Sequence, residues 1–207
     1  MAKIESFNNY AEEYDKWFDE NNQIFKSELK ALKEFIPEGL IGLEIGAGTG
    51  RFSKALNISL GIEPSLKMAE IARKKGVNII QASAEKLPLM DNTYDFVLLV
   101  TTICFLDDLE KSFLEIHRVL KYNGFVLIGF IEKNSILGKH YQEKKQNSRF
   151  YRDATFYSVH EVLSILKQIG FKKFTFRQTL FNKDINDIHP VKPGYGEGSF
   201  IVIKAKI

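Results

Sequence analysis

The sequence predicts an α/β protein with a doubly wound sheet of seven strands, mostly parallel, with an antiparallel last strand. Short apolar runs alternate with amphipathic segments along the 207 residues, which is the alternation of strands and helices that right-handed crossovers require. Apolar residues make up 44% of the chain, enough to form the core of one such domain. A glycine-rich turn at residues 46–50, directly after the first predicted strand, is the feature around which the other elements are arranged.

Residues 5–35 are predicted to be helical, because aromatic side chains recur at intervals of three and four residues between charged ones. Two interpretations of this aromatic face are open. The face packs on the domain, or its residues Tyr10 and Tyr14 line a lid over a ligand. The segment Pro37-Glu38-Gly39 then ends the helical region.

The first predicted strand, Gly39–Ile45, leads into glycines at positions 46, 48 and 50 and then into a helix that starts at Arg51. Glycine permits positive φ and leaves room for a ligand to approach the backbone, and the first amides of the following helix face the same crevice. The spacing limits the ligand. A dinucleotide fingerprint needs its third glycine at position 51, and no Gly-Lys-Ser/Thr closes the segment as in a phosphate-binding loop.

The second predicted strand, Ile58–Ile62, ends at Glu63, 19 residues after Glu44. An acid at the tip of the second strand of a βαβ unit lies beside the first glycine turn, where its oxygens accept hydrogen bonds from ribose hydroxyls. Ser65 is placed to cap a helix that continues through Lys74. Glu63 is therefore predicted to bind a ribose, against the alternative of an acid that merely ends a strand at the surface.

The middle of the chain adds a strand at Val77–Ala82, a strand at Tyr94–Val100 and a helix at Leu109–Leu120. The second of these is the most hydrophobic strand, which is typical of the centre of a parallel sheet covered on both faces. Asn123-Gly124 is expected to form a left-handed turn into a strand at Phe125–Ile131.

Residues 132–157 mix Lys and Arg with His, Tyr and Phe, and are expected to be an insertion that caps the crevice. A basic, aromatic segment binds RNA through stacking and phosphate contacts. A solvated helix with a few aromatic anchors is the alternative. Ser158 and Glu161 predict a capping box for a helix over 158–170, and residues 171–181 and 200–203 are the last predicted strands. The intervening loop, 184–198, is assigned no role.

Three motifs resemble those of the class I S-adenosylmethionine-dependent methyltransferases. The first is the E-x-G-x-G-x-G pattern at 44–50, the second is D/S-A-E-x-L-P-F/L at 83–89, and the third is E-x-x-R-V-L-K-P-G-G at 115–124. The resemblance covers about residues 40–130 and is greatest to the methyltransferase type 11 branch related to quinone biosynthesis. It implies a Rossmann-like fold, S-adenosylmethionine as cofactor, and the following cofactor-binding residues: Glu44, Gly46, Ala47, Gly48, Gly50, Glu63, Pro64, Met68, Ala84, Glu85, Val100 and Thr101.

Composition sets further limits. Lys and Arg number 29 against 26 Asp and Glu, so a nucleic-acid partner is allowed but not favoured. No apolar run is long enough to span a bilayer, which predicts a cytoplasmic protein without a membrane partner. The one cysteine, Cys104, stands where many relatives have histidine and is interpreted as a small core hydrophobe; no disulfide and no metal are expected.

A single methyltransferase domain, 1–207, is expected to act as a monomer or homodimer. Its parts are an N-terminal helical lid (1–37), a cofactor-binding core (38–131), the cap insertion (132–157) and the C-terminal part of the sheet (158–207).

The resemblance implies methyl transfer from S-adenosylmethionine by in-line displacement, accelerated mainly by alignment of the reactants. A small-molecule acceptor is predicted, because no D/N-P-P-Y/F loop follows the central strand as in enzymes that methylate base amino groups. An RNA methyltransferase and a non-catalytic S-adenosylmethionine-binding protein are the alternatives, and the acceptor atom (O, N or C) stays open. No catalytic residue is assigned, and the segments expected to cover the crevice carry these candidates for a general base: Tyr10, Tyr14, His140, Tyr141, Tyr157, His189 and Tyr195.

Overall fold

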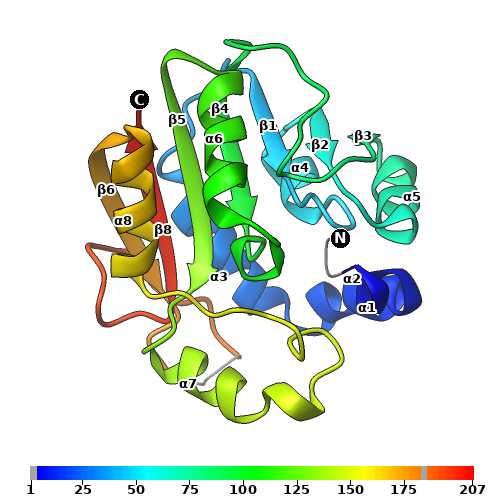
Figure 1. Cartoon of the computed structure of the whole chain (residues 1–207). Helices are drawn as coiled ribbons and strands as arrows, with labels where there is room; N and C mark the ends of the chain where they lie inside the picture. Colours follow the sequence, from blue (N-terminus) through cyan, green and yellow to red (C-terminus); the bar gives the residue numbers. More distant parts are fainter. Residues whose placement is uncertain (1–3, 183–185) are drawn as a thin grey trace.

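A mostly parallel sheet forms the centre of the molecule (Figure 1), in a computed structural model that describes residues 4–182 and 186–207. The strand order is β3-β2-β1-β4-β5-β8-β6-β7. The first five are parallel: β1 (Gly42–Ile45), β2 (Leu60–Ile62), β3 (Asn78–Ile80), β4 (Tyr94–Val100) and β5 (Leu120–Ile131). The others are β6 (Lys172–Thr179), β7 (Lys192–Pro193) and β8 (Phe200–Lys206).

The predicted fold class is confirmed, including the antiparallel last strand, since β8 runs antiparallel to both β5 and β6. The sheet has eight strands instead of the predicted seven. The additional strand is β7, a pair of residues in the loop 184–198 that bonds to the edge of β6. Residues 1–3 of the predicted lid and residues 184–185 of this loop lie outside the described residues.

Helices cover both faces of the sheet. On one face lie α6 (Leu109–Val119) and α8 (Val159–Ile169), and on the other α3 (Asn22–Lys33) and α4 (Arg51–Ala55). The remaining helices are α1 (Glu5–Asn9), α2 (Ala11–Glu20), α5 (Leu66–Lys74) and α7 (Ile136–Glu143), with short 3₁₀ turns at η1 (Ile103–Phe105) and η2 (Lys145–Asn147).

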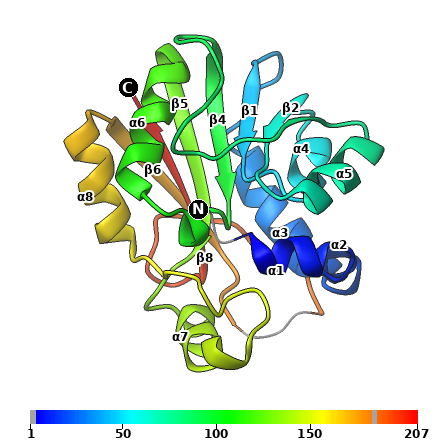
Figure 2. The same ribbon diagram turned by 45° about the vertical axis from the view of Figure 1, so that its right-hand side comes forward.

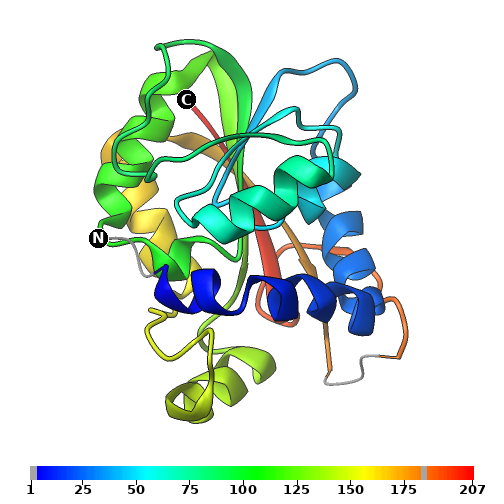
Figure 3. The same cartoon turned by 90° about the vertical axis from the view of Figure 1, so that its right-hand side faces the viewer.

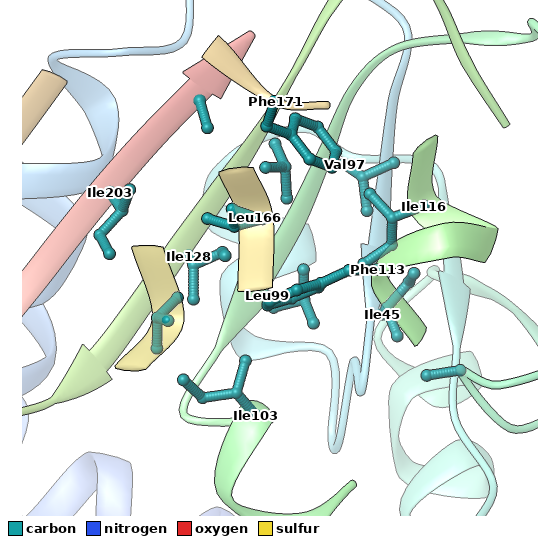
Figure 4. Packing of buried hydrophobic residues seen from close by; sticks show 14 of the residues in the cluster. Ile45, Val97, Leu99, Ile103, Phe113, Ile116, Ile128, Leu166, Phe171 and Ile203 are labelled. Atoms are coloured by element: carbon teal, nitrogen blue, oxygen red, sulfur yellow. The ribbon is translucent and has the colours of Figure 1, made fainter. Parts of the chain in front are cut away.

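Strand β4 divides the core because successive side chains of a strand point to opposite faces. Val97 and Leu99 pack under α6 and α8 with Phe113 and Leu166, the cluster drawn in Figure 4. Phe96, Leu98 and Val100 face α3 in a second cluster that includes Leu32, Phe52 and Phe200. This burial on both faces confirms the prediction that residues 94–100 form a central strand.

The N-terminal region, predicted to be helical over 5–35, consists of three helices that are separated by two breaks. The chain leaves helical geometry at Tyr10 (φ −128°, ψ 31°) and at Asn21 (φ −115°, ψ 39°). At the second break the backbone amide and the side-chain amide of Asn21 both donate to the carbonyl of Trp17, at 2.8 Å and 2.9 Å. The breaks allow α1, α2 and α3 to bend around the sheet.

The expected left-handed turn at Asn123-Gly124 is also wrong. Helix α6 ends at Val119, Leu120 takes an extended conformation, and β5 begins there. Gly124 is needed for close approach and not for positive φ, because a Cβ at this position would lie 2.8 Å from the Lys121 carbonyl oxygen.

The predicted lid and cap lie at the same end of the sheet. Helices α1 and α2 and the segment around α7 all lie beyond the carboxyl ends of β4 and β5, and the views in Figures 2 and 3 agree on this placement. In a doubly wound sheet this is the edge at which ligands bind.

Candidate functional site

A cleft opens at the carboxyl ends of β1, β2 and β4, and its floor is the glycine turn. Gly46 has φ +69°, and a Cβ there would lie 2.3 Å from Cγ2 of Thr102. Gly48 has φ +55° and leaves its backbone open to the cleft. The backbone of the turn therefore faces the cleft without side chains. At position 46 only glycine combines the positive φ with the close approach to Thr102.

Glu63 lies directly beside this turn. One carboxylate oxygen accepts a 2.8 Å hydrogen bond from the amide of Gly48, and the other accepts a 2.8 Å bond from the amide of Ser65. Each oxygen keeps a second lone pair, so the pair of oxygens can still accept from two vicinal hydroxyls. Burial raises the pKa of Glu63 to about 7, although the two amides oppose this shift.

The apolar wall of the cleft fits an adenosyl group. Pro64, Met68 and Ala84 form this wall, and Glu85 adds a carboxylate to the lining of the cleft. The carboxylate of Glu85 accepts a 3.0 Å hydrogen bond from the amide of Asp107, which ties the turn after β3 to the loop before α6. A pair of carboxylate oxygens that can accept from ribose hydroxyls, an open glycine backbone and an apolar wall thus lie in one cleft. These features fit S-adenosylmethionine.

Three of the predicted cofactor-binding residues lie behind the cleft, outside its lining. Glu44 is 1% exposed and accepts a short hydrogen bond from the hydroxyl of Ser53. Ala47 packs in a cluster with Ala69 and Ala72 of α5. Gly50 lets that helix approach, since a Cβ on it would meet Cβ of Ala72 at 3.0 Å. In this structure these three residues contact the elements that support the turn.

The mouth of the cleft is formed by Val100 and Thr101 at the end of β4. Thr101 has φ +51°, a strained conformation for a β-branched residue. Its amide donates a 2.7 Å hydrogen bond to the Gly129 carbonyl of β5, which holds the strained backbone in place.

Helix α2 is fastened over the glycine turn by a cluster of ions. Arg51 donates to Asp15 at 2.8 Å and to Asp19 at 2.7 Å, and Lys75 also pairs with Asp15. Burial acts to raise the pKa of Asp15, but the hydrogen bonds from Arg51 and Lys75 prevail and lower it to about 2. In the sequence Arg51 is notable only as a missing glycine, whereas in the structure it anchors α2 through Asp15 and Asp19.

A second cavity of about 480 Å³ adjoins the cleft beneath the N-terminal helices and the cap segment. The two cavities share the lining residues Phe7, Tyr14, Thr101 and Phe105. We call the second cavity the chamber and define it by these further lining residues: Trp17, Phe18, Ile24, Glu28, Phe52, Ile131, His140, Tyr141, Lys144, Asn147, Ser148, Phe150, Tyr151 and Leu180.

Glu28 of α3 is 5% exposed in the chamber wall and was not among the candidate residues predicted from the sequence. A detectable sign was present. Ile24, Glu28 and Leu32 recur every four residues, so a carboxyl occupies the apolar stripe of the helix.

The predicted candidates for a general base divide into two groups. Tyr14, His140 and Tyr141 line the chamber. Tyr10 packs against Phe150, Tyr157 lines a small separate cavity, the Nδ1 of His189 accepts from the amide of Phe181, and Tyr195 packs on Phe176, so these four lie outside the chamber lining.

Cys104 is half-buried, and its thiol lies 3.2 Å from the Thr101 carbonyl oxygen that accepts its hydrogen bond. Across residues 4–182 and 186–207, no group of three or more His, Cys, Asp or Glu side chains is arranged to hold a metal ion. In the same residues, no helix is both long enough and apolar enough to cross a membrane.

The buried carboxyls make the stability of the cofactor-free protein depend on pH. Burial raises the pKa of Glu28 to about 8 and that of Glu44 to about 8, from 4.5. At these two groups the folded state binds more protons than the unfolded state above pH 4.5, so their contribution to stability is fully present below this pH and is lost as pH rises through about 8. We expect Glu28→Gln to raise the unfolding free energy at about pH 8 by on the order of 2 kcal/mol, measured by denaturant unfolding.

The exposed substitution Glu12→Gln on α2 serves as the control, and its pH profile should match that of the native protein. If the native protein and Glu28→Gln lose equal stability between about pH 5 and pH 8, Glu28 is not a buried, ionisable group of the folded state.

The fold and the cleft define a class of protein that binds an adenosyl amino acid at the first glycine turn of a doubly wound sheet. Comparison with known proteins agrees. A family model described as "Methyltransferase domain" matches residues 43–128. The chain belongs to the S-adenosylmethionine-dependent methyltransferases, and S-adenosylmethionine is its cofactor.

Among individual relatives, the crystal structure of an S-adenosylmethionine-dependent methyltransferase of Thermotoga maritima, described as a possible histamine N-methyltransferase, is 44% identical. It covers 98% of this chain and 99% of its own, with a TM-score of 0.95. An uncharacterized protein of Methanocaldococcus jannaschii is 51% identical over 201 residues, 97% of this chain and 98% of that protein. A ubiquinone/menaquinone biosynthesis C-methyltransferase of Haemophilus ducreyi is 31% identical over 101 residues, which span 42% of this chain and 39% of the relative.

Proposed function

We propose that the protein transfers a methyl group from S-adenosylmethionine to a small-molecule acceptor by in-line displacement. The observation that carries this proposal is that the cleft and the chamber adjoin, with Thr101 and Phe105 among the residues that line both. The cofactor supplies an electrophilic methyl group on a positively charged sulfur. A molecule held in the chamber lies next to the cofactor cleft. Alignment of such an acceptor with the methyl group can by itself lower the activation barrier of methyl transfer by roughly 7–11 kcal/mol.

The cofactor contacts proposed for this reaction come from the cleft. Glu63 binds the ribose, Met68, Ala84 and Glu85 border the adenine, and Gly46 and Gly48 allow close approach of the amino-acid part. The supporting geometry is that all of these side chains or backbones line one cleft.

The shape of the chamber also bears on the acceptor. Its volume of about 480 Å³ suits a metabolite, and it is covered by α2 and by the segment around α7. The Thermotoga maritima relative is described as a possible histamine N-methyltransferase, and histamine is a small molecule.

RNA is the weaker alternative. Stacking on RNA needs exposed aromatic faces, whereas Phe150, Tyr141 and Tyr151 of the cap segment face the chamber. Two of its basic side chains are paired, Lys133 with Glu161 and Arg149 with Glu13.

A screen with methyl-labelled S-adenosylmethionine tests the proposal. The protein is incubated with a small-metabolite fraction and, separately, with total RNA, and label is followed into each. We expect labelled small molecules that depend on the protein and little label in RNA. Label in RNA alone, or in neither fraction while the cofactor binds, would contradict the proposed function.

A further inference from the structure

The chamber contains one feature that methyl transfer to a generic small molecule does not explain, the carboxyl of Glu28. No hydrogen bond or ion pair to this carboxyl forms within residues 4–182 and 186–207, although the side chain is 5% exposed. A buried carboxylate without a partner is unfavourable by several kcal/mol in general, so such groups are usually paired. The missing partner is accounted for if a ligand provides it.

The surroundings of Glu28 favour a positively charged ligand. Aromatic rings from α2, from the loop after β4 and from the cap segment face the chamber, and Tyr141 and Tyr151 stack with their centroids 5.1 Å apart. The faces of aromatic rings attract cations. Burial raises the pKa of Glu28 to about 8, and a cation beside it would restore the charged form.

The other titratable groups of the chamber do not replace such a cation. They are the phenols of Tyr14, Tyr141 and Tyr151, the imidazole of His140 and the ammonium of Lys144. Burial raises the pKa of all three phenols, so they stay neutral. Lys144 is exposed, and neither Lys144 nor His140 forms an ion pair with Glu28, whose pKa is shifted by burial alone.

From this arrangement we infer that the acceptor is an amine with an aromatic or apolar body, and that Glu28 binds its ammonium group and takes its proton. The inference rests on the proposed function. The ammonium gives one proton to the Glu28 carboxylate, and the amine nitrogen then uses its lone pair to attack the methyl carbon. The bond from that carbon to sulfur breaks, its electron pair stays on sulfur, and the proton on Glu28 passes to solvent when the methylated ammonium product leaves.

Other acceptor charges fit the chamber less well. An acidic acceptor would place a second negative charge beside Glu28, and a neutral alcohol would leave the carboxyl without an ionic partner. Protonated Glu28 could instead donate a hydrogen bond to a neutral acceptor. Comparing the binding of amines with that of their neutral analogues distinguishes this case from an ion pair.

Binding of matched probes tests the inference. The probes are 2-phenylethylamine and tryptamine, with their neutral analogues 2-phenylethanol and tryptophol, titrated by calorimetry into protein saturated with S-adenosylhomocysteine. We expect each amine to bind at least about tenfold more tightly than its alcohol, because an ion pair and cation–π contacts are added. Glu28→Gln should bring the ratio near one, and Glu28→Asp should retain part of the preference.

The control is Glu12→Gln, an exposed change on α2 that should leave the amine preference unchanged. Folding of each variant is checked by its affinity for S-adenosylhomocysteine, which should stay native because Glu28 does not line the cofactor cleft. The inference is overturned if the native protein does not prefer the amines, or if Glu28→Gln keeps the preference. If the labelled screen finds only neutral or acidic small acceptors, the proposed function stands and the amine assignment falls.

Discussion

Replacing Gly46 with alanine is expected to lower the unfolding free energy by about 2–5 kcal/mol and to abolish measurable cofactor binding. Two costs add at this position. A left-handed φ costs a residue with a Cβ roughly 1–2 kcal/mol, and overpacking a well-filled site costs typically 1–3 kcal/mol. The second cost applies because the added Cβ would lie 2.3 Å from Cγ2 and 2.5 Å from Oγ1 of Thr102.

Gly39→Ala provides a matched control. Gly39 has φ +82°, but a Cβ on it would meet nothing within 4 Å. It therefore carries the backbone cost alone, and we expect a loss of about 1 kcal/mol with native affinity for S-adenosylmethionine. Equal behaviour of Gly46→Ala and Gly39→Ala, in denaturant unfolding and in calorimetric titration, would show that the contact with Thr102 is unimportant.

Replacing Glu63 with alanine is expected to weaken binding of S-adenosylmethionine by about 1–3 kcal/mol, or roughly 5–150-fold. The change removes the predicted acceptor for the ribose hydroxyls. It also removes the acceptor for the amides of Gly48 and Ser65, which hold the turn in shape. Calorimetric titration with the cofactor measures the effect.

Glu70→Ala on α5 is the control for Glu63→Ala, because Glu70 is also a glutamate and pairs with Lys67 at the surface. It should leave cofactor affinity within about twofold of native, since exposed ion pairs contribute little. Native affinity in Glu63→Ala would remove Glu63 from the binding site.

The positions of Gly46 and Glu63 at one edge could be predicted because both follow from local order. A strand that ends in a glycine turn and a second strand that ends in an acid meet at the carboxyl edge of any right-handed βαβ unit. The same logic placed Ala84 and Thr101 at that edge. The helix caps at Ser65 and at Ser158 are equally local, and both are present.

Glu28 could not be predicted in the same way, because its burial depends on distant parts of the chain. The chamber around it is closed by Tyr141 and Tyr151, more than 100 residues away in sequence. The position of Glu28 in the apolar stripe of α3 is visible in the sequence, but the sequence around it does not show that distant segments close a chamber over this stripe. For Gly50 the glycine motif is evident in the sequence, but the reason for the glycine is visible only in the structure. A side chain at this position would collide with Ala72 of α5.

A crystal structure with S-adenosylhomocysteine and the acceptor identified in the labelled screen tests the central claim most directly. The account predicts ribose hydroxyls on the carboxylate of Glu63, adenine beside Ala84 and Glu85, and the sulfur directed past Thr101 toward an acceptor in the chamber. A cofactor product bound in the cleft with its sulfur turned away from the chamber, or an acceptor bound elsewhere on the surface, would contradict it.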